Sequence, residues 1–93
     1  MKKLKILIVD DDVELRQIYV EVFLNAGFEV FEAQDGVEGL DIAFKEIPDV
    51  IFTGIVMPRM DGFTMMETLK KTVMTANITI VISSHMGREE DQK

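Results

Sequence analysis

Apolar residues occur along this chain in four short runs that are typical of β-strands. The runs cover residues 4–9, 28–33, 49–53 and 78–82. All but the second are almost continuously apolar, which is expected of strands that are buried on both faces of a parallel sheet. The pattern therefore predicts one sheet of four strands with a buried centre.

The segment between the first two strands has the spacing of an amphipathic helix. Its apolar residues recur at intervals of three and four positions, so they are expected to form one buried stripe. The members of this stripe are Leu15, Ile18, Tyr19, Val22 and Ala26. Asp12 is the expected N-cap of the helix, and Gly27 is the expected stop at its C-terminus.

A second helix is predicted over residues 36–46. Asp35 and Glu38 are placed to cap its start, and Pro48 is placed to end it. Its expected buried residues are Leu40, Ala43, Phe44 and Ile47.

A third helix is expected to begin near Asp61 or Gly62 and to bury Met65, Leu69 and Val73. The polar segment 88–93 is expected to be the exposed first turn of a fourth helix. Strands and helices thus alternate along the chain. This alternation predicts an α/β fold with a doubly wound parallel sheet.

The composition indicates one small globular domain over residues 1–93. Apolar residues make up 47% of the chain, enough to build one core and too many for a disordered chain. The 17 acidic and 10 basic residues give a net charge of −7, which argues against binding to nucleic acid or to anionic membranes. Cysteine is absent, and the first apolar run is too short for a signal peptide or a membrane span, so a cytoplasmic location is expected.

The loops that follow three of the predicted strands are expected to meet at one end of the sheet. Residues 10–12 are aspartates that follow the first strand, Gly54 and Val56 follow the third, and Ser83 and Ser84 follow the fourth. Open α/β sheets bind ligands at the carboxyl ends of their strands. A site that offers carboxylate oxygens without histidine or cysteine favours Mg²⁺ as the bound ion.

A simpler interpretation of the three aspartates stays open at this point. One of them caps the following helix, and the other two are only solvated. Against this, two carboxylates beyond the cap repel each other at a strand end unless a cation joins them.

Three segments of the chain resemble the receiver domains of bacterial response regulators. Residues 8–11 have the sequence Ile-Val-Asp-Asp, residues 57–62 have Met-Pro-Arg-Met-Asp-Gly, and residues 82–84 have Ile-Ser-Ser. Their order and spacing match that family over the whole chain, and the central segment is highly specific to it. The resemblance implies a flavodoxin-like fold similar to that of a chemotaxis regulator, with four strands in the order 2-1-3-4 and three helices before the helical stub.

The resemblance also implies a role for each residue at the sheet edge. Asp11 is expected to be a direct Mg²⁺ ligand, Asp10 to assist directly or through water, and the backbone carbonyl of Val56 to be a third ligand. The hydroxyl of Ser83 is expected to contact a phosphoryl group, and Ser84 occupies a position where a small residue controls access to the phosphate.

Gly54 stands where the family carries its phosphate-accepting aspartate. Glycine has no attacking oxygen, so phosphoryl transfer from a partner histidine is not expected there. Thr53 is expected to point to the other side of the strand, and Asp61 belongs to the next turn, so neither replaces the aspartate. The missing carboxylate also predicts weakened Mg²⁺ binding. The alternative is that Gly54 is only a permissive turn residue.

The resemblance further predicts an incomplete domain. No residue corresponds to the lysine that the family carries on a fifth strand, and the family's last strand and helix are expected to be missing. The strand over residues 78–82 then becomes an apolar sheet edge, and such edges recruit other strands. We therefore expect homo-oligomers that form through this edge.

Two functional hypotheses follow. In the first, the chain is a two-component receiver in a non-phosphorylatable form, which binds a histidine kinase or a phosphotransfer protein without accepting phosphate. In the second, it is a structural fragment that dimerises or swaps elements through the edge at residues 78–82 and has no signalling activity. An enzyme is not expected in either case, because no complete catalytic set is visible.

Overall fold

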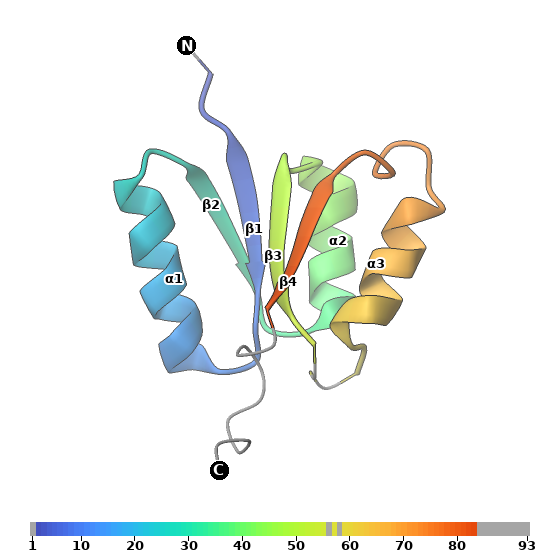
Figure 1. Cartoon of the computed structure of the whole chain (residues 1–93), viewed down its shortest axis with the longest axis horizontal. Helices are drawn as coiled ribbons and strands as arrows, with labels where there is room; N and C mark the ends of the chain where they lie inside the picture. The colour runs from blue at the N-terminus through green and yellow to red at the C-terminus, as the bar shows by residue number, and fades with distance from the viewer. Residues whose placement is uncertain (1, 56, 58, 84–93) are drawn as a thin grey trace.

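The computed structural model describes residues 2–55, 57 and 59–83 of the chain (Figure 1). In chain order the elements are β1 (Lys5–Val9), α1 (Val13–Asn25), β2 (Glu29–Ala33), α2 (Gly36–Glu46), β3 (Val50–Gly54), α3 (Gly62–Lys70) and β4 (Thr79–Ser83). The four predicted strands and three predicted helices are therefore confirmed. The helical stub expected at residues 88–93 lies outside the described residues.

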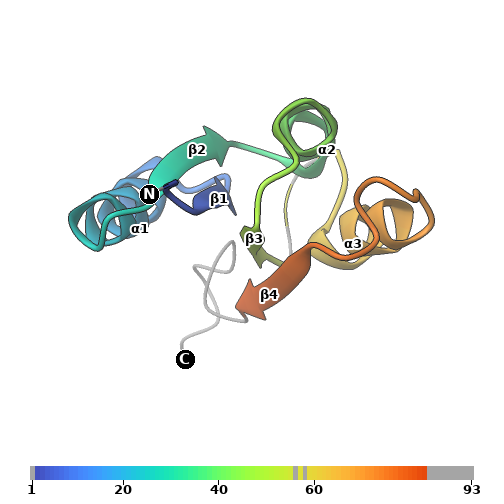
Figure 2. The same cartoon turned by 90° about the horizontal axis from the view of Figure 1, so that it is seen from above.

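The four strands are parallel and form one sheet in the order β2-β1-β3-β4. This order and the α/β architecture confirm the predicted fold class. In Figure 2, α1 lies on one face of the sheet, and α2 and α3 lie on the other. The central strand β1 is covered from both sides, which explains why Ile6, Leu7, Ile8 and Val9 are all buried and apolar.

Each face of the sheet has its own apolar core. The core between the sheet and the two helices α2 and α3 contains Leu7, Val9, Ala33, Ala43, Ile51, Met57, Met65, Leu69 and Ile78. The core under α1 is smaller, with Ile6, Ile8 and Val20 buried and several aromatic residues packed around them. Tyr19 meets Phe52 edge to face there, with ring centroids 4.9 Å apart.

The buried stripe predicted for α1 is partly wrong. Leu15 and Tyr19 pack against the sheet as expected, together with Val20. Ile18 and Val22, however, are 58% and 53% exposed. The spacing identified an apolar surface on the helix correctly, but α1 is rotated so that only one flank of that surface meets the sheet. No described element covers the other flank, and Ala26 lies beyond the helix as its exposed C-cap.

The expected buried residues of the other two helices also need correction. In α2, Ala43 is buried and Leu40 and Ile47 pack against the core, but Phe44 is 41% exposed. In α3, Met65 and Leu69 are fully buried as predicted. Val73 is 90% exposed because α3 ends at Lys70, before the next apolar position of the stripe is reached.

The helix boundaries follow the predicted caps. Each described helix starts with an aspartate whose carboxylate accepts a hydrogen bond from the backbone N–H three residues later, and these caps are Asp12, Asp35 and Asp61. After α1, Gly27 has a φ of 97°, the left-handed conformation that favours glycine as a helix stop. None of the helices in the described part of the chain has the length and hydropathy needed to cross a bilayer.

The start of α2 packs so closely against the loop before α3 that only glycine fits at position 36. A Cβ atom on Gly36 would overlap the backbone oxygen of Met60 and lie 2.7 Å from its Cβ. We expect Gly36→Ala to lower the free energy of unfolding by about 1–3 kcal/mol, the usual cost of overpacking. Urea denaturation measures this loss.

Gly39→Ala, in the same helix, is the matched control. A Cβ atom there meets the flexible end of Met65, with Sδ at 2.9 Å, rather than backbone. Alanine also favours the helix interior by about 1 kcal/mol over glycine. An equal loss of stability in the two variants would contradict this account of the α2 start.

Candidate functional site

The carboxyl ends of β1, β3 and β4 meet at one edge of the sheet, the lower edge in Figure 1. Val9 pairs in register with Thr53, so Asp10 and Gly54 follow these residues at the same level. Gly54 in turn pairs with Ser83. The structure thus brings together three positions that the sequence assigned to one site, at the edge where open α/β sheets bind ligands.

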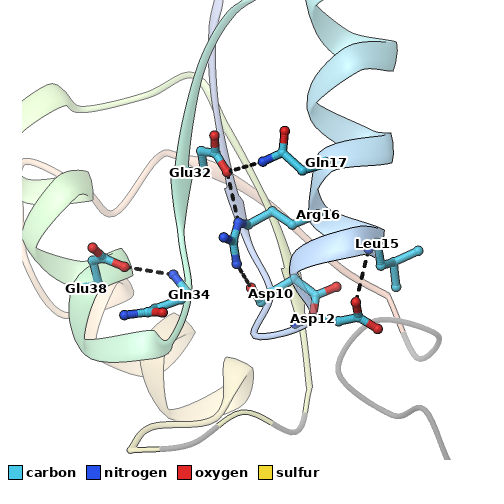
Figure 3. Close-up of polar contacts among 8 residues, drawn as sticks. All are labelled: Asp10, Asp12, Leu15, Arg16, Gln17, Glu32, Gln34 and Glu38. Atoms are coloured by element: carbon cyan, nitrogen blue, oxygen red, sulfur yellow. Dashed lines mark hydrogen bonds and ion pairs between the residues drawn. The ribbon is translucent and has the colours of Figure 1, made fainter.

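Asp10 is fully buried and held from several directions. Its backbone N–H donates to the carbonyl of Ala33 at 3.1 Å, and its own carbonyl accepts from Arg16 Nη1 at 2.6 Å (Figure 3). Its Oδ1 accepts from the backbone N–H of Asp12 at 3.0 Å. Its Oδ2 is buried and has no hydrogen-bond partner among the described residues. One oxygen of this carboxylate therefore remains available for a ligand.

Burial raises the pKa of Asp10 to about 6. Removal of the carboxyl from water is the largest cause, and the backbone N–H of Asp12 opposes it only in part. The negative charges of Asp11 and Asp12 raise the pKa further. A cation at this point would offset both the lost solvation and the repulsion.

The three consecutive aspartates have three different environments. Asp12 caps α1, so the simpler interpretation holds for that residue. Asp11 is exposed to solvent. Asp10 is buried, and the expectation that both remaining aspartates are only solvated is therefore wrong for Asp10.

Gly54 is the last residue of β3 and is buried. Among the described glycines, only Gly27 has a positive φ, so the backbone at position 54 does not require glycine. The alternative that Gly54 serves as a permissive turn residue is not supported by this conformation. The N-terminus of α3 lies against the same point, because a Cβ atom on Gly62 would overlap the backbone oxygen of Gly54.

Thr53 and Asp61, the two residues considered above as replacements for an aspartate at position 54, use their side-chain oxygens in local contacts. Thr53 is buried on the α2–α3 side, where its hydroxyl donates to the carbonyl of Gly54 at 3.1 Å and contacts Met57 Sδ at 3.9 Å. Asp61 caps α3, and the N–H groups of Thr64 and nearby residues hold the pKa of its carboxyl below the ordinary value. Both oxygens are committed to local structure.

The remaining candidates that the sequence singled out are Ser83, Val56 and Ser84. Ser83 is half-buried at the end of β4, while Val56 and Ser84 lie outside the described residues. In the part of the chain that the structure describes, no three His, Cys, Asp or Glu side chains are grouped so that they could hold a metal ion. A cation here would therefore depend on two carboxylates together with other oxygen ligands.

Sequence reasoning missed the polar residues that support Asp10. Arg16 donates from Nε to Glu32 Oε1 at 2.9 Å, and Gln17 Nε2 donates to the same oxygen at 3.0 Å (Figure 3). These residues come from α1 and β2, and no spacing along the chain links them to Asp10. Only the parallel pairing of β1 with β2 brings them together.

A second missed contact connects the loop before α3 to the start of α2. Arg59, at a φ of 71°, forms an ion pair with the buried carboxylate of Asp35 at 2.9 Å. Burial alone would raise the pKa of Asp35, but the N–H of Glu38 and the Arg59 guanidinium outweigh it, and the pKa lies below its ordinary value.

The site and fold define a class of signalling protein. The model of the response regulator receiver domain matches residues 6–93, so the chain belongs to this family of two-component signalling modules. Sporulation initiation phosphotransferase F of Bacillus subtilis (strain 168) is 39% identical over 83 residues, which are 89% of this chain. The DNA-binding dual master transcriptional regulator RpaA of Synechocystis is 32% identical over 88 residues, or 95% of this chain. The chain spans 65% and 36% of these relatives, less than two thirds of each.

Solved structures show the same similarity. The chemotaxis response regulator CheY4 of Vibrio cholerae superimposes with a TM-score of 0.84 at 33% identity, over 87% of this chain and 68% of that one. The CheX–CheY–BeF3–Mg²⁺ complex from Borrelia burgdorferi gives a TM-score of 0.79 at 27% identity, over 85% of this chain and 60% of the matched chain.

The buried carboxylate of Asp10 destabilises the fold at neutral pH. Its pKa rises from 3.8 to about 6 on folding, so the folded chain holds this proton more tightly than the unfolded chain. The stability contribution of Asp10 therefore falls as the pH rises from about 4 to about 6, by about 3 kcal/mol at most. We expect Asp10→Asn to increase the free energy of unfolding at pH 7 and to flatten this fall.

Asp35→Asn is the control with the opposite sign. The pKa of Asp35 is lowered, so its charge contributes stability above its ordinary pKa, and this is lost as the pH falls through the folded value. Asparagine at this position should therefore reduce stability at neutral pH. Urea denaturation between about pH 4 and pH 7 measures both variants. A loss of stability at pH 7 in Asp10→Asn would show that the buried carboxylate is compensated within the chain.

Proposed function

We propose that this receiver domain cannot be phosphorylated at Gly54 and that it acts by binding a histidine kinase or a phosphotransfer protein without accepting phosphate. The observation that supports this proposal is the position of Gly54. It lies at the end of β3, level with Asp10 on one side and paired with Ser83 on the other. The family's nucleophile belongs at this point, and glycine has no side chain.

The chemistry of phosphoryl transfer explains why this absence matters. A carboxylate oxygen must attack phosphorus in line while the bond from phosphorus to the donor's oxygen or nitrogen breaks. Thr53 precedes Gly54 and Asp61 lies in the next turn, and the side-chain oxygens of both are engaged in local hydrogen bonds. The described part of the site therefore offers no acceptor at the end of β3.

The residues present still fit a divalent cation. Asp10 supplies a buried oxygen without a partner among the described residues, and Asp11 supplies an exposed carboxylate next to it. We assign these two side chains and the backbone carbonyl of Val56 as Mg²⁺ ligands, by resemblance to the family. A bound Mg²⁺ would supply positive charge that attracts phosphate oxygens. The related CheY of Borrelia burgdorferi was crystallised with Mg²⁺ and BeF3.

The affinity for Mg²⁺ should be lower than in a receiver with an aspartate at position 54. One charge pair at about 4 Å contributes roughly 4 kcal/mol at an effective dielectric constant near 20, and a water molecule in the vacated position offsets part of this loss. In this proposal Ser83, which pairs with Gly54, and Ser84 have no phosphoryl group to contact. The domain would act in the cytoplasm, as a binding module rather than an enzyme.

Acetyl phosphate with Mg²⁺ tests the proposal directly. We expect no gain of a phosphoryl group by the wild-type chain in intact-mass spectrometry. We expect Gly54→Asp to gain one, because its carboxylate attacks phosphorus and acetate leaves. Gly54→Asn is the matched control, since it has nearly the same size and no nucleophilic carboxylate. Stoichiometric phosphorylation of the wild-type chain, labile to hydroxylamine, would overturn the proposal.

A second candidate function is assembly through β4. Among the described residues β4 pairs on one side only, with β3. It contains no charged residue, and Val81 is 44% exposed. The opposite edge strand, β2, exposes Glu29 and Glu32, charges of the kind that discourage pairing between edges. This contrast favours β4 as the edge that recruits a second copy.

Size-exclusion chromatography with light scattering tests the assembly hypothesis. If copies pair through β4, Val81→Lys should shift the chain from dimer towards monomer, because a lysine on an edge strand blocks strand addition. Val73→Lys is the control, since Val73 is 90% exposed and lies outside the sheet. A wild-type chain that stays monomeric at micromolar concentration would exclude this function.

A further inference from the structure

Arg16 has an unusual place for a cation next to an acidic site. Its side chain is only 13% exposed, although α1 is largely a surface helix. It donates from Nη1 to the backbone carbonyl of Asp10 at 2.6 Å and from Nε to Glu32 Oε1 at 2.9 Å. The guanidinium therefore connects the end of β1 with β2 (Figure 3).

Arg16 contacts the backbone carbonyl of Asp10 and not its side-chain carboxylate. The charge of Arg16 is paired with Glu32, and Gln17 binds the same carboxylate oxygen. The side chain of Asp10 accepts from Asp12 through Oδ1, and Oδ2 keeps no partner among the described residues. Arg16 thus holds the backbone of Asp10 without pairing with its carboxylate.

The backbone of Asp10 is fixed at both of its polar groups. Its N–H donates to Ala33 in the neighbouring strand, and its carbonyl accepts from Arg16. These two contacts hold the peptide groups on either side of the Asp10 Cα atom, and with them the direction of its side chain. The carbonyl of Asp10 belongs to the peptide group that leads into Asp11, so the same contact restrains both aspartates.

We infer that Arg16 is a positioning residue, which orients the carboxylates of Asp10 and Asp11 towards a divalent cation without supplying a ligand or a compensating charge. This inference rests on the proposed cation site. Arginine suits the role because its planar group presents donors in two directions at once, to a carbonyl and to a carboxylate. Lysine offers only a flexible point charge.

Binding of Mn²⁺, measured by isothermal titration calorimetry, separates positioning from charge. Removal of a positive charge makes the chain more negative, so an effect of charge alone would tighten cation binding in Arg16→Gln. Loss of positioning would instead weaken cation binding. We expect Arg16→Gln to bind Mn²⁺ roughly 10- to 100-fold more weakly, the range seen when supporting residues of metal ligands are removed. Arg16→Lys should restore only a small part of the affinity.

Lys5→Gln is the matched control. Lys5 is the first residue of β1, the strand that Asp10 follows, so it lies at the opposite end of the sheet from the site. It too donates to a carbonyl and to a carboxylate, both of Glu46. This variant removes the same charge and a similar ion pair, so its Mn²⁺ affinity should equal that of the wild type or exceed it slightly. Equal affinities in the Arg16→Gln and Lys5→Gln variants would overturn the inference.

The backbone amide of Asp12 gives a readout that needs no metal. It donates to Asp10 Oδ1, so its chemical shift and hydrogen exchange report the orientation of that carboxylate. We expect Arg16→Gln to shift this amide and speed its exchange, and Lys5→Gln to leave it unchanged. An unchanged Asp12 amide in Arg16→Gln overturns the positioning role alone. A wild-type chain that binds no Mn²⁺ overturns the proposed cation site, and with it the metal-directed part of the inference.

Discussion

The buried carboxylate of Asp10 is the constraint on which the rest of the site depends. A charged group without solvent is unfavourable unless a partner compensates it, and one Asp10 oxygen has no partner among the described residues. Its backbone, in contrast, is held by Ala33 and Arg16. Hydrogen bonds within the fold thus hold in place a carboxylate that lowers the stability of the folded chain. Such an arrangement is typical of sites that are organised for a ligand rather than for the stability of the chain.

The parallel sheet explains how this acidic site and Gly54 come to share one edge. Parallel register places the ends of β1, β3 and β4 together, so Asp10, Gly54 and Ser83 lie along one edge of the sheet. The α3 N-terminus still packs against Gly54, as the contact from Gly62 shows. Under the proposed function, glycine at position 54 removes a chemical step without requiring a different fold.

Most of the fold could be predicted from local signals, because apolar runs, aspartate caps and Gly27 act over a few residues. The errors arose where position depends on distant contacts. Helical spacing identifies an apolar surface but not its rotation, so Ile18 and Val22 were wrongly expected to be buried. The alignment of Asp10 with Gly54 followed from topology, but the burial of Asp10 did not. The contacts of Arg16 with Asp10 and Glu32 could not be predicted, because these partners lie 6 and 16 residues away in sequence and meet Arg16 only in the folded chain.

A Mg²⁺ titration followed by backbone amide chemical shifts tests the central claim most directly. The claim is that an acidic cation site persists at the ends of β1, β3 and β4 although the phosphate acceptor is gone. The expected result is a weak, saturable set of shifts confined to residues 10–12 and to the amides of Gly54 and Ser83, which disappears in Asp10→Asn. Shifts that are absent from these residues, or that persist unchanged in Asp10→Asn, would contradict the account.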